Sequence, residues 1–198
     1  MKIGTPKEIA EGEARVAMTP ASARDLQKLG FTCCIESGAG DKAGFSDAAY
    51  EEAGVEIVKT AAALWKSADI IAKVRQPSET ELKRLTKAKT LISFFNPGGN
   101  EEGLELAKSK GATVIAMEMV PRISRAQKMD ALSSMANIGG YRAVVEASNN
   151  FGRFFTGQIT AAGKVPPAKV LVVGAGVAGL AAIGAAMSMG AITYAFDV

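Results

Sequence analysis

The residues whose spacing most clearly suggests chemistry are the glycines of Gly174-Ala175-Gly176-Val177-Ala178-Gly179. An apolar β-branched run precedes this motif, and a helical run of small residues follows it. Gly174 permits a tight turn, Gly176 lets a ligand approach the backbone, and Gly179 lets the helix pack against the strand. The start of that helix offers unpaired N–H groups and a positive dipole end to an anion. The motif therefore predicts a site for the pyrophosphate of a dinucleotide.

A carboxylate follows the next expected strand, at the point where that strand ends. Asp197 comes directly after the run 192–196 and lies 23 residues beyond Gly174. An acidic residue at this place in a dinucleotide-binding fold accepts hydrogen bonds from the hydroxyls of the adenosine ribose. Its charge would also repel the 2′-phosphate of NADP. The pattern therefore predicts NAD as the cofactor, with Asp197 at the ribose.

A second polar cluster lies in the segment 121–130, between the end of an expected strand and the start of a long helical pattern. It contains Arg122, Arg125, Gln127 and Asp130. Loops that follow the carboxyl ends of strands are where open α/β sheets bind ligands. The spacing alone leaves two interpretations open: a ligand-binding loop, or a solvated loop in which Asp130 only caps the helix.

The composition excludes several classes of function. The chain has 198 residues and no histidine, which removes imidazole acid–base catalysis, Ser-His and Cys-His nucleophiles, and His-ligated zinc. The net charge of +3 and the aromatic content of 6% argue against a nucleic-acid partner. An enzyme of this composition must therefore work with carboxylates, lysine or a cofactor that brings its own chemistry, and we predict no metal site.

Short apolar runs alternate with helical patterns over the first part of the chain. The expected strands lie at 3–5, 31–35, 55–58, 70–74, 90–95 and 113–117. Strands that alternate with helices indicate an α/β fold with a mainly parallel sheet and helices on both faces. Cys33 and Cys34 are neighbours in one such strand, so their side chains should point to opposite faces and form no disulfide.

The organisation that follows has two Rossmann-like or flavodoxin-like parallel-sheet domains. Residues 1–130 are expected to form the first domain, and residues 131–164 a long connecting helix and linker. Residues 165–198 then begin a dinucleotide-binding domain that stops after its first β-α-β unit. Gly139-Gly140 weakens the prediction of one straight connecting helix. The uncharged stretch 170–190 is long enough to span a bilayer, but its glycines and alanines argue against a transmembrane helix.

The sequence resembles the NAD-binding component of proton-translocating NAD(P) transhydrogenase, which is related to the alanine dehydrogenases. The stretches that carry the resemblance are Pro121–Gln127, Asp130–Ser134, Phe151–Gly163 and the motif at Gly174. The amino-terminal stretches Pro6-Lys7-Glu8 and Glu13–Ala17 are shared with the alanine dehydrogenases. The resemblance covers the whole chain.

The resemblance implies a role for each candidate residue. Arg122, Gln127, Asp130 and Ser133 would hold the nicotinamide end of NAD. Ala175, Gly176 and Val177 would hold the pyrophosphate, and Asp197 the adenosine ribose with Val198 beside it. The family's component forms a dimer and passes hydride directly to NADP on a separate component, while a membrane component couples the transfer to proton movement. The implied location is the cytoplasmic face of the inner membrane, or the matrix side in a mitochondrion.

Two alternatives remain open at this stage. One is an alanine-dehydrogenase-like oxidoreductase, because Arg15 and Lys73 resemble that family's substrate-carboxylate residues. That family also uses a histidine at the substrate, and the comparable strand end here reads Phe94-Phe95-Asn96-Pro97. The other alternative is an inactive fragment, because Val198 ends the chain before a full mononucleotide-binding half is complete. We expect the 198-residue chain to be inactive by itself.

Overall fold

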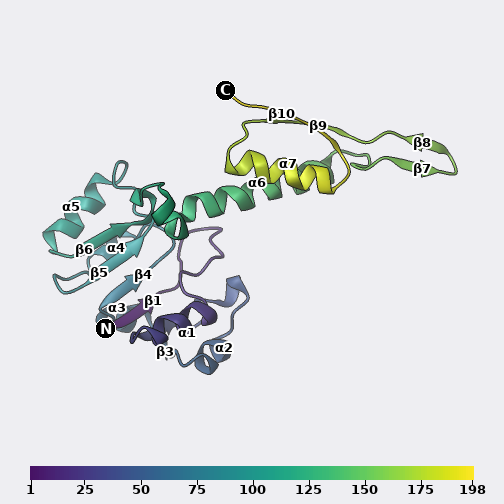
Figure 1. Cartoon of the computed structure of the whole chain (residues 1–198). Coiled ribbons are helices and arrows are strands. Elements are labelled where there is room, and N and C mark those ends of the chain that lie inside the picture. The colour runs from purple at the N-terminus through teal and green to yellow at the C-terminus, as the bar shows by residue number, and fades with distance from the viewer. The chain divides into compact units, whose positions relative to one another are not determined.

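The computed structural model describes residues 1–198, and the chain divides into two compact units, Met1–Val120 and Pro121–Val198 (Figure 1). The sequence-based boundary follows residue 130. The contacts of the structure group the segment 121–130 with the long helix that follows it, and not with the first sheet. This grouping matters for function because the polar loop and the glycine motif then belong to the same unit.

Six parallel strands form the sheet of the first unit, in the order β3-β2-β1-β4-β5-β6. They are β1 (Lys2–Thr5), β2 (Thr32–Glu36), β3 (Glu56–Val58), β4 (Ile70–Ala72), β5 (Thr90–Ser93) and β6 (Thr113–Ala116). Each strand falls on an expected apolar run, and every neighbouring pair is parallel. The α/β fold class predicted from the sequence is therefore confirmed.

Helices connect these strands, and local sequence signals start several of them. They are α1 (Pro20–Lys28), α2 (Asp47–Glu52), α3 (Ala61–Ser67), α4 (Glu79–Leu82) and α5 (Glu101–Ser109), with short 3₁₀ turns η1 (Asp41–Ala43) and η2 (Met117–Met119). Thr19 caps α1, and Pro20 occupies its first position. At α4 the Ser78 hydroxyl accepts the N–H of Glu81, and the Glu81 carboxylate accepts the N–H of Ser78. The capping box expected from the sequence is present.

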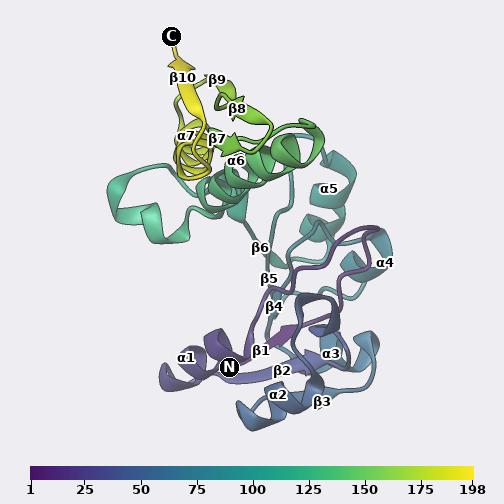
Figure 2. The same ribbon diagram turned by 90° about the vertical axis from the view of Figure 1, so that its right-hand side faces the viewer.

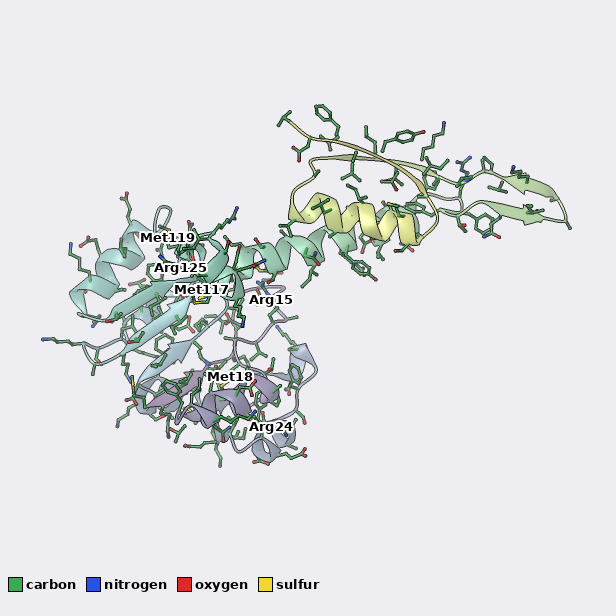
Figure 3. The ribbon with its side chains drawn as sticks, viewed as in Figure 1. Arg15, Met18, Arg24, Met117, Met119 and Arg125 are labelled. Atoms are coloured by element: carbon green, nitrogen blue, oxygen red, sulfur yellow. The ribbon has the colours of Figure 1, made fainter.

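Two apolar clusters cover the two faces of this sheet. Trp65 of α3 lies in one cluster, and Met18, labelled in Figure 3, lies in the other beside Ala23 of α1. Cys33 belongs to the cluster with Met18, whereas Cys34 belongs to the cluster with Trp65, and both thiols are free. The alternation of a strand thus separates the two cysteines, as predicted.

The second unit contains a helical pair, a hairpin and a two-stranded parallel sheet. Its elements are η3 (Ser124–Met129), α6 (Ala131–Asn150), β7 (Gln158–Thr160), β8 (Gly163–Val165), β9 (Lys169–Val173), α7 (Val177–Ser188) and β10 (Ile192–Phe196). The β-α-β unit β9-α7-β10 is the one expected from the sequence, while the antiparallel hairpin β7-β8 was not predicted. Helices α6 and α7 pack side by side, as both views show (Figures 1 and 2).

The uncharged stretch 170–190 is divided between β9, α7 and the turns that flank them. No helix of the chain is both long enough and apolar enough to cross a membrane. One face of the β9-β10 sheet carries exposed apolar side chains, with Leu171 at 66% and Phe196 at 57% exposure. The opposite face contributes Val170 to a small core with α7.

Candidate dinucleotide-binding site

The glycine turn between β9 and α7 has the backbone geometry that the sequence motif requires. Gly174 has φ +98°, a backbone conformation that residues other than glycine adopt only with strain. A Cβ on Gly179 would lie 1.7 Å from the carbonyl oxygen of Gly174, so the helix meets the turn with no room for a side chain. A Cβ on Gly174 or Gly176 would meet no atom within 4 Å, so the space in front of the turn is open to a ligand.

The first turn of α7 is free to bind an anion. Gly176 is the N-cap of α7 and supplies no side-chain hydrogen bond to the helix. The N–H groups of an uncapped first turn, together with the positive end of the helix dipole, form an anion site. The open geometry at Gly174 and Gly176 therefore fits the pyrophosphate of a dinucleotide.

Asp197 lies beside this turn, at the carboxyl end of β10. Its Oδ2 accepts the N–H of Ala175 at 2.7 Å, and its Oδ1 accepts the N–H of Val198 at 2.8 Å. The Ala175 N–H, and to a smaller extent that of Val198, holds the pKa of the Asp197 carboxyl below its usual value. The carboxylate is therefore ionised at neutral pH, and its remaining lone pairs can accept hydrogen bonds from hydroxyl groups.

Asp130 caps α6 and stands where the polar loop enters that helix. Its Oδ1 accepts the N–H of Ser133 at 2.9 Å, and its Oδ2 accepts the Ser133 hydroxyl at 2.6 Å. The Ser133 hydroxyl, the Ser133 N–H and the charge of Arg122 lower the pKa of Asp130. Asp130 is thus the N-cap of α6. Capping does not exclude a second role, because a carboxylate has more acceptor sites than these two bonds use.

Two adjoining cavities bring the polar loop and the glycine turn together. The larger, of about 730 Å³, is lined by Arg122, Ile123, Ser124, Gln127, Asp130, Ser133, Ser134, Asn137 and Val177. The smaller, of about 360 Å³, is lined by Arg122, Leu132, Ser133, Ala136, Val173, Gly174, Gly176, Val177, Ala178 and Gly179. Arg122, Ser133 and Val177 line both. These volumes fall in the range of small-molecule sites, which is ~300–1,000 Å³.

The structure therefore collects most of the residues singled out in the sequence. Ala175 and Asp197 join the site through the hydrogen bond between them, while Val198 is fully exposed at the end of the chain. Sequence reasoning missed Ser134 and Asn137, which line the larger cavity. Their signal was present, because residues 130, 133, 134 and 137 share one helical face at spacings of three and four.

The charged residues at the strand ends of the first unit pair with one another. The Lys73 ammonium lies 2.8 Å from Glu81 Oε1 and 3.5 Å from Glu8 Oε2, and its side chain is 1% exposed. Glu13 binds both Arg15 and Arg75 at 2.7 Å. The hydrogen bond from Arg15 is the largest cause that lowers the pKa of Glu13 to about 2. Each of these cations therefore already has a carboxylate partner.

Asn96 lies in the strand end Phe94-Phe95-Asn96-Pro97, directly after β5. It has a left-handed backbone with φ +52°. The Glu118 carboxylate accepts the N–H groups of Phe95 and Asn96 and so fixes the backbone there. None of the side chains of this strand end acts as a general acid or base at neutral pH.

Comparison with protein families identifies the class of protein that this fold and site define. Residues 4–139 match "Alanine dehydrogenase/PNT, N-terminal domain", and residues 143–198 match "Alanine dehydrogenase/PNT, C-terminal domain". The chain belongs to the alanine dehydrogenase/PNT family.

Individual relatives lie on both branches of this family. The chain is 75% identical over 198 residues to NAD(P) transhydrogenase subunit alpha of Cereibacter sphaeroides, covering all of the chain and 38% of that subunit. It is 34% identical over 201 residues to alanine dehydrogenase of Mycolicibacterium smegmatis, covering all of the chain and 54% of that enzyme. The chain therefore spans well under two thirds of the length of these relatives.

Solved structures show the same division. A transhydrogenase structure from Sinorhizobium meliloti matches with a TM-score of 0.95 at 43% identity, covering 100% of this chain and 57% of that one. An L-alanine dehydrogenase structure matches with a TM-score of 0.84 at 32% identity, covering 96% of this chain and 53% of that one. Sequence identity and structural similarity both favour the transhydrogenase branch.

Proposed function

We propose that this chain is the NAD(H)-binding part of a proton-translocating NAD(P) transhydrogenase. In this proposal Arg122, Gln127, Asp130 and Ser133 hold the nicotinamide end of NAD. The turn at Ala175, Gly176 and Val177 holds the pyrophosphate, and Asp197 the adenosine ribose with Val198 beside it. The observation that carries the proposal is the pair of adjoining cavities that join this polar loop to the uncapped start of α7.

The proposed reaction asks little acid–base chemistry of the protein. The cofactor supplies a hydride, which passes directly to the nicotinamide of NADP on a separate component. No proton leaves a substrate in that step, so a chain without histidine can serve it. The work of Arg122, Gln127 and Asp130 is to orient the nicotinamide ring and limit its motion.

The partners follow from the same proposal. Hydride acceptance requires an NADP-binding component, and coupling to protons requires a membrane component on whose surface this chain is held. The proposal also includes a homodimer of the complete subunit. These partners are consistent with the high identity to alpha subunits of transhydrogenases.

Alanine oxidation is the second candidate, because the alanine dehydrogenases share the fold at a TM-score of 0.84. Two features argue against it. Lys73, which would receive the substrate carboxylate, is buried between Glu8 and Glu81. The chain has no histidine, and the comparable strand end Phe94-Phe95-Asn96-Pro97 supplies no acid–base group of the kind that contributes ~10²–10⁴-fold.

Cofactor titration of the full-length subunit tests the proposal. We expect saturable binding of NAD and binding of NADP at least tenfold weaker, because Asp197 would face the 2′-phosphate. Gly174→Ala should abolish NAD binding by straining the turn, whereas Gly184→Ala, whose Cβ meets open space in α7, should not. Equal or tighter binding of NADP would contradict the cofactor assignment. Steady NADH formation from alanine and NAD would favour the second candidate.

A further inference from the structure

Two neighbouring glycines in the middle of α6 have different surroundings. Gly139 is exposed, and a Cβ there would meet nothing within 4 Å. Gly140 is buried, and a Cβ there would lie 1.9 Å from the carbonyl oxygen of Ala178. The Cα–H bond that replaces a side chain at Gly140 therefore faces a backbone carbonyl in the first turn of α7, a recognised helix–helix contact.

The contact lies on the helical face that leads to the site. Ser133, Ala136, Gly140 and Val144 follow one another at spacings of three and four, so they share one side of α6. Ser133 and Ala136 line the smaller cavity, opposite Ala178 and Gly179 of α7. Gly140 is thus the next position along the same face, about 10 Å from Ser133 at 1.5 Å per residue.

The start of α7 is packed tightly against the glycine turn. Gly179 follows Ala178 directly, and a Cβ at Gly179 would lie 1.7 Å from the carbonyl oxygen of Gly174. Ala186 of α7 is fully buried in a core with Val144, Phe155 and Ala168. A side chain at position 140 would therefore push α6 away from α7 and the glycine turn, which are packed together as one unit.

We propose that Gly140 is a positioning residue that sets the distance between α6 and the glycine turn, and so holds Ser133 and Asp130 at the dinucleotide. This inference rests on the proposed function. A Cβ at position 140 falls roughly 1.5 Å short of ordinary van der Waals distance from the Ala178 oxygen. A misplacement of ~1 Å at reacting groups can cost ~10²-fold.

The proposal separates two parts of the ligand. Ser133 lies in α6 and Asp130 caps that helix, and both would hold the nicotinamide end. Gly176 caps α7, and Asp197 directly follows β10, so these two residues are carried by the β9-α7-β10 unit. Displacement of α6 should therefore weaken binding of NAD and spare binding of adenosine monophosphate (AMP). A general loss of folding would reduce the binding of both ligands alike.

Calorimetric titration of the full-length subunit with NAD and with AMP provides the test. We expect Gly140→Ala to weaken NAD binding tenfold or more and AMP binding less than threefold. Gly139→Ala, one residue away and with the same gain in helix propensity, should leave both within twofold. Equal NAD affinities for Gly140→Ala and Gly139→Ala would overturn the inference, as would equal losses of NAD and AMP.

A second variant covers the case in which Gly140→Ala does not fold. Ala182→Val enlarges α7 one turn beyond Ala178, in the core shared with Val144, without lining either cavity. It should lower the ratio of NAD to AMP affinity in the same direction, and an unchanged ratio would overturn the inference. Gly174→Ala distinguishes failure of the proposed function: if it leaves NAD binding intact, the glycine turn is not the site.

Discussion

Replacement of Lys73 by methionine is expected to destabilise the first unit, because Lys73 neutralises two buried carboxylates. Its Nζ lies 2.8 Å from Glu81 and 3.5 Å from Glu8, whose side chains are 7% and 4% exposed. Methionine keeps most of the aliphatic length and removes the charge. Both carboxylates would then be buried without a cation.

The magnitude follows from the partners that remain. Removal of one member of a buried ion pair costs ~3–5 kcal/mol. Glu8 still accepts the N–H of Val74 at 2.6 Å, and Glu81 that of Ser78 at 2.8 Å, so we expect the lower end of that range. With a urea m-value of ~1.5–3 kcal/mol/M, a loss of about 3 kcal/mol lowers the unfolding midpoint by about 1–2 M.

Urea unfolding followed by the fluorescence of Trp65 measures this loss. Trp65 is the single tryptophan of the chain and is 1% exposed in the core of the same unit. Lys108→Met is the matched control, because Lys108 pairs with Glu105 on the surface, where such pairs contribute ~0.2–1 kcal/mol at most. A midpoint for Lys73→Met that equals the control would refute the reasoning.

Two further predictions concern the loop and the strand ends. Gln127→Ala should slow hydride transfer to an NADP analogue by more than tenfold in the full-length subunit with its NADP-binding component, while NAD affinity falls much less, because Gly176 and Asp197 lie outside the loop. An unchanged rate would leave the loop as a solvated cap of α6. Glu13, with its pKa lowered to about 2, stabilises the first unit above its unfolded-state pKa near 4.5, and this contribution is lost as the pH falls toward 2. The stability difference between the parent and Glu13→Gln should therefore narrow over that interval in acid unfolding monitored by Trp65, and a constant difference would contradict the assignment.

The elements of this chain could be predicted because their signals are local. Ser78 and Glu81 define a capping box within four residues, and the apolar runs of the strands are bounded by turn residues. The hairpin β7-β8 was missed because its strands have three residues each and only one large apolar side chain is exposed on it, Ile159. Such short strands carry too little periodicity to distinguish them from a linker.

The candidate site was predicted in its parts and not in its assembly. The glycine motif, Asp197 and the loop at residues 122–130 each carry a recognisable pattern. Their meeting in two adjoining cavities depends on α6 lying against α7, which no local pattern specifies. Lys73 illustrates the converse, because it resembles a substrate-carboxylate residue of the alanine dehydrogenases, whereas the fold buries it between two carboxylates of the chain itself.

The amino-acid sequence by itself determined the places of the six strands of the first sheet and of the β9-α7-β10 unit, the parallel α/β class, the glycine at the tight turn of residue 174 and the absence of an imidazole acid or base. These depend on the preferences of neighbouring residues and on composition. Only the tertiary structure decided that Gly139 faces solvent while Gly140 meets the backbone of Ala178. The two glycines are identical in type and adjacent in sequence, so only the face of α6 that packs against α7 can distinguish them.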